Sequence, residues 1–598
     1  MSPVSPIAAN TDLVTMTVLA NGSALPDTFE VQQIRTQRQV NRIPSARIVL
    51  YDGDASGEAF AISSSSTLLP GTTIVIKAGY HNGTESTLFS GIVVRHAIQV
   101  RSNHKSYLVL TCFDKALGLT IGRKSAYVGT TDSAIFSQII GAAGLTAQVS
   151  ATPAASMNMV RYYATDWDFL VARAEVNGML VLVADGCVNI APPKVDGTPT
   201  LLIEYGNALN EVTAEIDASL QLSSVTATSW DCASQATVAG QSSEPAVNAQ
   251  GNLSGATLAA VLGLPAFELQ SNAPATADEL SNWASAQLLK SRLSKVRGKV
   301  TFRGNGGIIP GGMIQLAGVG DRFNGAAYAS SVVHTIENGN WMTEVGFGLS
   351  PQWFASEAAD VEAAPASGLV PAAGGLLIGT VKQTDSDPAG QNRVLVEVPM
   401  IASSGEGIWA RLGSPYAGSG AGILFMPEAG DEVILSFINN DPRSPVILGS
   451  LYSSARAPAY APDAPNTYKV IVTKSQLKLT MDDVKKIIVV STPGGHTLTM
   501  SDDAASVTLV DSNGNKLAMG SGGMTLSSCA DMTLNANGNI SLNANAGAVQ
   551  LTGSTEVTSS APNISASASA ALSLQGNLSG KLASSGELTV QGLMVMIN

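Results

Sequence analysis

The sequence predicts a mainly β protein with a few helices, and its last part is expected to form an intertwined, triple-stranded β-helix of a homotrimer. Runs of β-branched residues alternate with turn residues along the chain, which is typical of strands. The 58 glycines, together with only 13% charged and 5% aromatic residues, indicate thin cores and much surface buried against partners. The third observation is a regular repeat of apolar residue pairs that begins near Gly495.

In this repeat, two apolar residues one position apart alternate with polar gaps rich in Gly, Asn and Ser. The two members of a pair lie on the same face of a strand. The pairs are Leu498/Met500, Val507/Leu509, Leu517/Met519, Met524/Leu526, Met532/Leu534, Ile540/Leu542, Val549/Leu551, Leu572/Leu574 and Leu588/Val590.

One such repeat cannot be stable alone. Burying a pair gains about 3 to 5 kcal/mol, whereas ordering eight residues costs about 1 to 2 kcal/mol each for the backbone. Many repeats must therefore stack, and several chains must share the core. We interpret residues 469–598 as one third of a trimeric needle, and a disordered Ser/Gly/Asn-rich tail is the alternative.

Composition excludes several classes of protein. The net charge of −13 and the absence of a basic run disfavour nucleic acid as a partner. The cysteines lie far apart and away from histidines, so we interpret them as small buried residues: Cys112, Cys187, Cys232 and Cys529. No secretory signal is visible at the N-terminus, and the apolar stretch 256–264 is too short to span a bilayer. A soluble protein made in the cytoplasm is expected.

The first part of the chain predicts strands followed by a helix. The strands are expected at Arg47–Tyr51, Thr73–Lys77, Leu88–Val93 and Tyr107–Thr111, with turn signals such as Asn82-Gly83 between them. The helix covers 131–143, begins at Thr131 or Asp132 and places Ile135, Ile139 and Ile140 on one face.

An N-capped second helix is expected within Tyr163–Met179; it ends at Gly178 and leads into a strand at 180–183. Its first turn contains Asp166 and Asp168. Paired carboxylates suit acid–base chemistry, but a helix N-terminus favours them locally, so we interpret them as capping residues.

This helix carries a recognisable pattern: Tyr163, a small residue, Asp166 and an aromatic, then Asp-Phe-Leu, Arg-Ala-Glu and Gly178. The pattern resembles the hub domain of VgrG-type spike proteins and contractile phage tails. Strands at 299–314 and 328–334, after a helix at Ala277–Leu293, are similar to the end of that hub. The resemblance implies a hub-like tube adaptor at 1–355, forming a trimeric ring with pseudo-sixfold symmetry.

An Ala/Pro/Gly-rich linker is expected at 356–374, followed by a small barrel at 375–453 and a second linker at 454–468. The barrel strands are predicted at Leu377–Gln383, Arg393–Val398, Gly407–Arg411, Gly422–Met426, Glu432–Phe437 and Val446–Leu451. The stretch from Pro427 to Tyr452 closely resembles the OB-fold domain of VgrG and phage spikes. Because it lacks the basic groove and stacked aromatics of nucleic-acid sites, we interpret the barrel as a structural collar.

The sequence offers no catalytic, cofactor or metal site. None of His81, His96, His104, His334 and His496 has a partner at metal spacing, and no hydrolase or phosphate-binding motif is present. His496 could join two symmetry copies in a threefold site on the needle axis, but we interpret it as a solvent-facing turn residue. The few residues between Tyr452 and the needle leave no room for the lysozyme domain of some phage spikes.

The C-terminus is apolar to its end, at Leu593, Met594, Val595, Met596, Ile597 and Asn598. Three copies would form an exposed apolar platform, and such ends are usually covered. By resemblance, a PAAR-type tip protein is expected to bind it; the alternative is that these residues complete the core themselves.

Together these features predict a non-enzymatic spike of a contractile injection system. The needle entry at 473–503 looks like that of spikes from extracellular, phage-tail-like systems. The resemblance implies docking on the inner tube and baseplate proteins, cargo effectors, only transient contact with the target membrane, and a location inside the injection particle, extracellular after release. A trimeric tail-fibre-like adhesin would need a globular tip after the needle, and a spike with hydrolase activity would need an extra domain.

Overall fold

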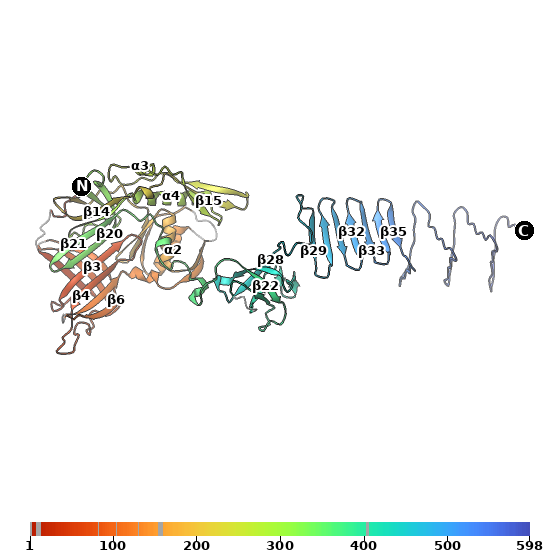
Figure 1. Cartoon of the computed structure of the whole chain (residues 1–598), viewed down its shortest axis with the longest axis horizontal. Helices are drawn as coiled ribbons and strands as arrows, with labels where there is room; N and C mark the ends of the chain where they lie inside the picture. The colour runs from red at the N-terminus through yellow and green to blue at the C-terminus, as the bar shows by residue number, and fades with distance from the viewer. Residues whose placement is uncertain are drawn as a thin grey trace. The chain divides into compact units, whose positions relative to one another are not determined.

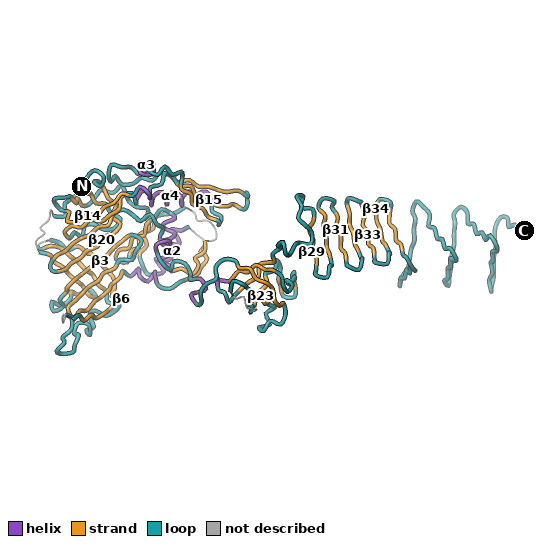
Figure 2. Tube along the Cα trace, viewed as in Figure 1, coloured by secondary structure: helices purple, strands orange, loops and turns teal. Residues whose placement is uncertain are grey.

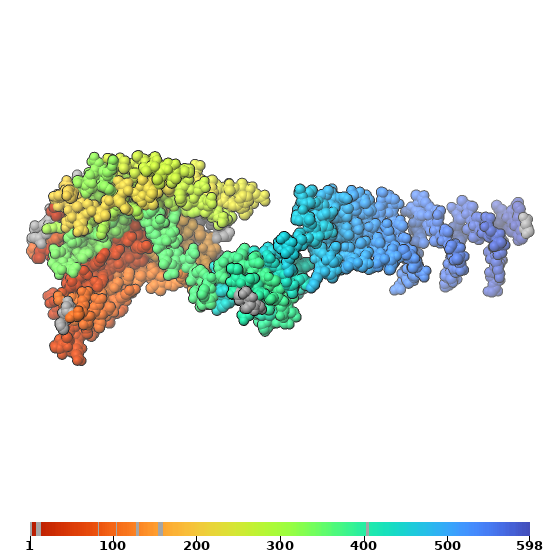
Figure 3. All heavy atoms as spheres, in the orientation of Figure 1, coloured from red at the N-terminus to blue at the C-terminus, as the bar shows by residue number. Residues whose placement is uncertain are grey.

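The computed structural model describes residues 3–7, 13–81, 83–102, 105–128, 131–153, 159–401 and 406–597. The chain separates into two compact units, 1–451 and 452–598. Both are shown in Figure 1, Figure 2 and Figure 3. The fold is mainly β, as the sequence predicts.

The first unit is built on one large sheet, in the order β14-β18-β21-β20-β3-β4-β7-β6-β5-β1-β2, with β13 joined through β19. Its pairs are antiparallel except that β13 runs parallel to β19. The strands are β1 (Val14–Ala20), β2 (Ser23–Ala24), β3 (Val31–Gln39), β4 (Ser45–Tyr51), β5 (Thr73–Tyr80), β6 (Ser86–Val100), β7 (Ser106–Phe113), β13 (Leu201–Glu204), β14 (Leu209–Ile216), β18 (Val296–Arg303), β19 (Met313–Ala317), β20 (Gly325–Glu337) and β21 (Asn340–Phe347).

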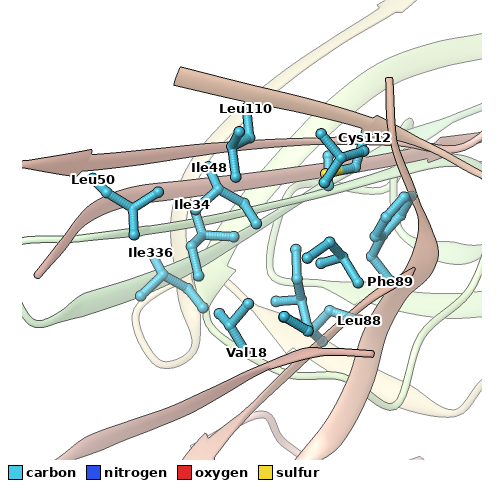
Figure 4. Close-up of a cluster of buried hydrophobic side chains, with 14 of the residues drawn as sticks. Val18, Ile34, Ile48, Leu50, Leu88, Phe89, Leu110, Cys112 and Ile336 are labelled. Carbon is cyan, nitrogen blue, oxygen red and sulfur yellow. The ribbon is translucent and has the colours of Figure 1, made fainter. Parts of the chain in front are cut away.

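Alternation along these strands creates the main core. Successive side chains point to opposite faces of the sheet. On one face, Ile34 and Thr36 of β3 and Ala46, Ile48 and Leu50 of β4 are buried. Figure 4 shows Val18, Ile34, Ile48, Leu110 and Ile336 pointing toward one another from β1, β3, β4, β7 and β20. The strands predicted in the first part of the chain are confirmed, although β6 is longer than expected. The Asn82-Gly83 turn lies partly outside the described residues.

A small α/β cluster follows in the chain. Helices α1 (Asp132–Ala142) and α2 (Asp166–Val176) and the sheet β11-β12-β9 share one core. Thr131 is the N-cap of α1, which decides between the two predicted caps. Gly178, at φ +66, follows the C-terminal end of α2, where a left-handed residue is favoured. The strands are β8 (Lys124–Val128), which pairs with β10 (Met159–Ala164), and β9 (Thr146–Val149), β11 (Leu180–Ala184) and β12 (Cys187–Ala191).

Helix α4 (Ala277–Leu293) has the bounds that the sequence predicts. Thr276 caps it, and the Glu279 carboxylate accepts a hydrogen bond from the Thr276 amide, which completes a capping box. The helix packs on the sheet β16-β15-β17 through Leu280, Ala284 and Leu288. The remaining elements here are β15 (Val225–Asp231), β16 (Ala236–Gln241), β17 (Phe267–Ser271), α3 (Gly255–Ala259), α5 (Phe354–Glu357), and the 3-10 turns η1 (Lys115–Thr120), η2 (Ala218–Leu220) and η3 (Pro365–Gly368).

A closed barrel, in the order β22-β23-β24-β28-β27, completes the first unit. Its core holds Val381, Val396, Val433 and Leu435, whose side chains are at most 1% exposed. The elements are β22 (Leu377–Gln383), β23 (Val394–Glu397), β24 (Ile408–Leu412), β25 (Ala417–Gly418), β26 (Ala421–Gly422), β27 (Glu432–Phe437), η4 (Ile438–Asn440) and β28 (Pro445–Ser450). The predicted strand Gly422–Met426 is wrong: β25 and β26 form a two-residue hairpin, and residues 423–426 leave it without strand pairing.

The second unit begins with an antiparallel meander, β29 to β35, in which each strand pairs with its neighbours in sequence (Figure 2). The strands are β29 (Tyr468–Val472), β30 (Lys478–Asp482), β31 (Ile487–Ser491), β32 (Thr497–Ser501), β33 (Ser506–Val510), β34 (Lys516–Gly520) and β35 (Gly523–Ser527). Residues 528–597 carry no strand in the described chain. An intertwined needle would supply the pairing partners of this stretch from other chains, so the strands expected at its apolar pairs stay a prediction.

Candidate assembly surfaces

The apolar pairs of the meander form a continuous face. Each pair occupies the second and fourth positions of its strand, and the register places these positions opposite each other in successive strands. We call this surface the apolar ladder. Its first column is Ile471, Leu479, Val490, Leu498, Leu509, Leu517 and Leu526, and its second is Met481, Ile488, Met500, Val507, Met519 and Met524.

The other face of the meander is mostly polar or small. Its central column contains four threonines together with two valines and an alanine: Val470, Thr480, Val489, Thr499, Thr508, Ala518 and Thr525. In the single chain, the ladder remains accessible to water: Leu509 is 51% exposed and Met524 is 71% exposed. Contiguous apolar surface of this kind marks an interaction site. The ladder is therefore the leading candidate for an assembly surface in the second unit.

The remaining apolar pairs of the second unit are also exposed. In Figure 3 the atoms of β29–β35 form a continuous block, whereas those of the following residues form separate ridges. The exposed pairs are Met532/Leu534, Ile540/Leu542, Val549/Leu551, Leu572/Leu574 and Leu588/Val590. The proposed tip-binding residues Leu593, Met594, Val595, Met596 and Ile597 are exposed as well, and Asn598 lies outside the described residues.

The barrel presents a second exposed apolar segment, at the place where the predicted strand is missing. Ile423, Leu424 and Phe425 are 45%, 79% and 61% exposed. Beside them lies an open groove of about 580 Å³, whose lining includes Tyr416 and Arg411. No sequence signal other than this apolar run points to the groove.

The paired carboxylates at the start of α2 have structural partners. The Asp166 carboxylate accepts hydrogen bonds from Arg161 and, at 2.7 Å, from the Lys124 ammonium. The Thr165 hydroxyl donates to the Asp168 carboxylate at 2.6 Å and accepts from the Asp168 amide at 3.0 Å. The N-cap of α2 is Thr165, so the two aspartates lie in the first turn with structural partners but are not the capping residues that the sequence predicts.

Glu175 joins four segments, and sequence reasoning missed it. Its buried carboxylate accepts hydrogen bonds from Lys290 at 2.7 Å, from Asn41 at 3.2 Å and from the Phe354 amide at 2.7 Å. The Lys290 side chain is itself only 12% exposed. Glu175 therefore ties α2 to α4, to the turn after β3 and to the start of α5. Glu175 is the last residue of the Arg-Ala-Glu pattern, which is the one trace of this role in the sequence.

The stretch expected as a linker at 356–374 is held at both ends. Arg123 donates to the carbonyl oxygens of Asp360 and Glu362, the latter at 3.0 Å. Ala366 is 1% exposed, and the Ala373 amide donates to the Asn440 carbonyl at 2.8 Å. The boundaries of this linker and of the other predicted domains stay predictions.

The histidines lie apart. His334 is buried in the large sheet, and Trp341 and Thr343 approach its Nδ1 at 3.4 and 3.0 Å. His96 contacts Ser63, and His496 is exposed; His104 lies outside the described residues. Within the described ranges, no group of three or more His, Cys, Asp or Glu side chains could hold a metal ion.

The cysteines are free thiols of different exposure. Cys112 lies in the main core, where burial raises the pKa of its thiol to about 12. Cys187 is partly buried, whereas Cys232 and Cys529 are exposed. The expected burial is therefore wrong for the last two, because they lie in turns rather than in strands. No helix in the described part of the chain is long and apolar enough to cross a membrane.

His334 makes the stability of the first unit depend on pH. Because an indole N–H can only donate, the Trp341 contact makes Nδ1 an acceptor, and a neutral ring is required. Burial and the nearby Arg38 lower the pKa of His334 from 6.5 to about 3. Below pH 6.5 the His334 ring therefore binds a proton in the unfolded chain but stays neutral in the folded chain until the pH falls toward 3. The first unit should lose up to about 4 to 5 kcal/mol of stability from this residue as pH falls from 6.5 toward 3.

Urea denaturation of the full chain, followed by tryptophan fluorescence at several pH values, measures this loss. His334→Gln should remove the residue's share of the slope between pH 6.5 and 3, whereas the exposed His496→Gln should keep it. Identical slopes in the parent and in His334→Gln would show that the ring is already charged in the folded state.

Comparison with known proteins finds a family model for each of two regions of the first unit. A model of the Alg8 N-terminal domain matches residues 10–338, which is more than half of the 598 residues. A model of the type VI secretion system/phage-baseplate injector OB domain matches residues 377–452, the region of the closed barrel.

Two curated proteins of Vibrio cholerae serotype O1 are similar over short stretches. The type VI secretion system spike protein VgrG3 is 37% identical over 87 residues, which is 14% of this chain and 9% of that protein. The actin cross-linking toxin VgrG1 is 36% identical over 67 residues, 11% of this chain and 6% of that protein. The matches thus span less than a tenth of either relative's length.

Among solved structures, the E. coli c3393 protein, a component of the type VI secretion system, aligns over 73% of this chain and 99% of its own. The TM-score is 0.36 and the identity 13%. The family assignment rests on the matched sequence regions. The chain belongs to the Alg8 N-terminal domain family and is a VgrG-like, phage-type spike protein that carries an injector OB domain.

Proposed function

We propose that three copies of the chain assemble along the apolar ladder into an intertwined needle. The observation that carries this proposal is the register, which aligns the apolar pairs in two unbroken columns on one face. In the single chain these side chains are exposed or only partly buried. Turning this face toward two other chains buries it, and the polar opposite face stays in water. The exposed pairs beyond β35 continue the same pattern. We assign the needle to residues 469–598.

The needle is the working part of a mechanical spike in a contractile injection system. Residues 1–355 act as the hub that docks on the inner tube and on baseplate proteins, and the OB barrel is a collar between hub and needle. Sheath contraction drives the spike through the target envelope, with transient membrane contact and no enzymatic step. The toxin activity named for one relative stays with that protein, since the match covers 6% of it.

The exposed tip residues from Leu593 to Ile597 bind a small tip protein of the PAAR type in this proposal. Three copies together present an apolar platform with open strand edges, and covering such edges prevents aggregation. The chain is made in the cytoplasm, enters the particle there, carries cargo effectors with it, and leaves the cell when the particle is released.

Native mass spectrometry tests assembly and tip binding together. The full-length chain should give about three times 61.3 kDa, resist mild SDS, and gain the mass of a co-expressed PAAR-type protein. A chain lacking 593–598 should stay trimeric and lose that added mass. A monomeric full-length chain would overturn the needle, whereas equal tip recovery by both chains would overturn only the tip assignment.

A further inference from the structure

Three arginines lie in one row across the large sheet of the first unit. Arg35 of β3 lies directly opposite Arg47 of β4, Arg47 lies opposite Thr111 of β7, and Thr111 lies opposite Arg95 of β6. Directly opposite residues in paired strands share one face of a sheet. The three guanidinium groups therefore leave the sheet on the same side.

That side faces away from the core. The strand neighbours Ile34, Ile48 and Leu110 are at most 1% exposed and point into the main core shown in Figure 4. Because side chains alternate along a strand, the arginines beside them point outward. Arg35 and Arg95 are exposed, and Arg47 is partly exposed.

The surrounding strands lack negative charge. Over their described lengths, β3, β4, β6 and β7 contain no aspartate or glutamate, although Asp and Glu outnumber Lys and Arg by 46 to 33 in the whole chain. This part of the sheet is therefore a positively charged surface on a protein whose net charge is negative. It escapes a search for basic runs, because its arginines come from three strands that are distant in the sequence.

Within the described ranges, no carboxylate pairs with these arginines. Arg47 donates to the neutral Gln33 side chain at 3.1 Å. The carboxylate of Glu337, which lies opposite Gln33, is occupied by the amides of Gln32 and Gln33 at 3.1 and 2.8 Å. Among the described residues, none of the three arginines forms an ion pair. Like charges directly opposite each other in a sheet are destabilising, so this arrangement costs the isolated chain stability.

An aromatic and apolar cluster lies beside the row on the same face. Tyr107, Val49 and Val109 pack together, and Arg101 lies over the Tyr107 ring at 5.3 Å from its centre. Tyr51 stacks beside Tyr107, with ring centres 5.3 Å apart. Tyrosine and arginine are the residue types that dominate the centres of protein interfaces.

We propose that this outer surface of β3, β4, β7 and β6, the arginine face, binds a carboxylate-rich segment of another protein. A guanidinium group matches a carboxylate with two parallel hydrogen bonds. Adjacent strands lie about 4.8 Å apart, so Arg35 and Arg47 can share one acidic side chain while Arg95, two strands from Arg47, takes another.

An acidic segment fits better than nucleic acid. Duplex DNA carries one charge per about 1.7 Å, and a chain of net charge −13 repels such a polyanion more strongly than it repels a short peptide. The arginine face belongs to the first unit alone, so this inference stands apart from the needle and its assembly.

The test uses the full-length chain and a fluorescein-labelled oligo-glutamate peptide at low salt, with binding followed by fluorescence anisotropy. The triple variant R35Q/R47Q/R95Q should bind the peptide at least about tenfold more weakly, because charge-assisted hydrogen bonds are lost. Added salt should weaken binding by the parent chain. The matched control, R297Q/K299Q/K382Q, removes three cations that already pair with Glu215, Glu344 and Glu397, and it should bind as the parent does.

Equal binding by the two triple variants would overturn the proposal, and urea midpoints close to or above that of the parent show that both variants are folded. Tighter binding of a single-stranded oligonucleotide of equal charge, lost in R35Q/R47Q/R95Q, would assign the face to nucleic acid instead. A changed native mass of that variant, with peptide binding intact, would assign the face to a contact between copies. Either of these two outcomes rejects the acidic segment.

Discussion

Aspartate at both Leu498 and Leu509 is expected to abolish the trimer and leave a monomer whose first unit is intact. The two leucines lie opposite each other on β32 and β33, in the middle of the apolar ladder. In the assembled needle, the substitution would bury unpaired carboxylates from all three chains, and each buried, unpaired charge costs several kcal/mol. The native mass should fall from about three times 61.3 kDa to 61.3 kDa.

The opposite face of the same strands offers a matched control. Thr499 and Thr508 also lie directly opposite each other, one position away from the leucines and on the other side of the sheet. Thr499→Asp with Thr508→Asp adds the same charge to the same strands, yet it should keep the trimer, because this face stays in water. Loss of the trimer in both variants, or in neither, would contradict the assignment of the ladder as the shared core.

Glu175→Ala is expected to lower the free energy of unfolding of the first unit by about 3 to 5 kcal/mol. The substitution leaves the buried Lys290 ammonium without its carboxylate and the Phe354 amide without its acceptor. Urea denaturation of the full chain, monitored by tryptophan fluorescence, measures the loss.

Two further variants separate charge from packing. Glu215→Ala removes a carboxylate that is 63% exposed and pairs with Arg297 at the surface, so it should cost less than about 1 kcal/mol. Glu175→Leu combined with Lys290→Met should recover much of the loss, since no unpaired buried charge remains. A Glu175→Ala variant as stable as Glu215→Ala would show that the buried ion pair contributes little.

The elements with strong local signals could be predicted from the sequence. The capping box at Thr276 and the helical spacing of its apolar residues give α4 its predicted bounds. Strict alternation of buried and partly buried positions does the same for β27. The strand predicted at Gly422–Met426 is absent because a strand also needs a neighbour to pair with. After the hairpin at Ala417–Gly422, residues 423–426 pair with no barrel strand, although Met426 packs against the barrel core. The apolar composition of a segment does not indicate whether a neighbouring strand is available for pairing.

The candidate surfaces also differ in how far the sequence predicts them, because some depend on local spacing and others on residues far apart in the chain. The pair spacing of the ladder is local, so its face was predictable, and the structure adds the register that joins the pairs into columns. The arginine face and the Glu175 junction depend on residues that are distant in sequence. Arg35 and Arg95 are 60 positions apart, and Glu175 and Phe354 meet across 179 positions. The order of strands in the large sheet brings the arginines together, and the packing of α2 against α4 and α5 forms the Glu175 junction.

The neighbour-to-neighbour pairing of β29 to β35 also determines how the length of this unit can change. Each strand depends only on the strand before it and the strand after it, so removing two consecutive strands preserves the direction of the chain and the face of every remaining side chain. Each such step alters the reach of the meander by about 9.6 Å, twice the spacing between strands. Insertion or loss of whole hairpins can therefore adjust the length of this unit in small increments without redesign of its interior.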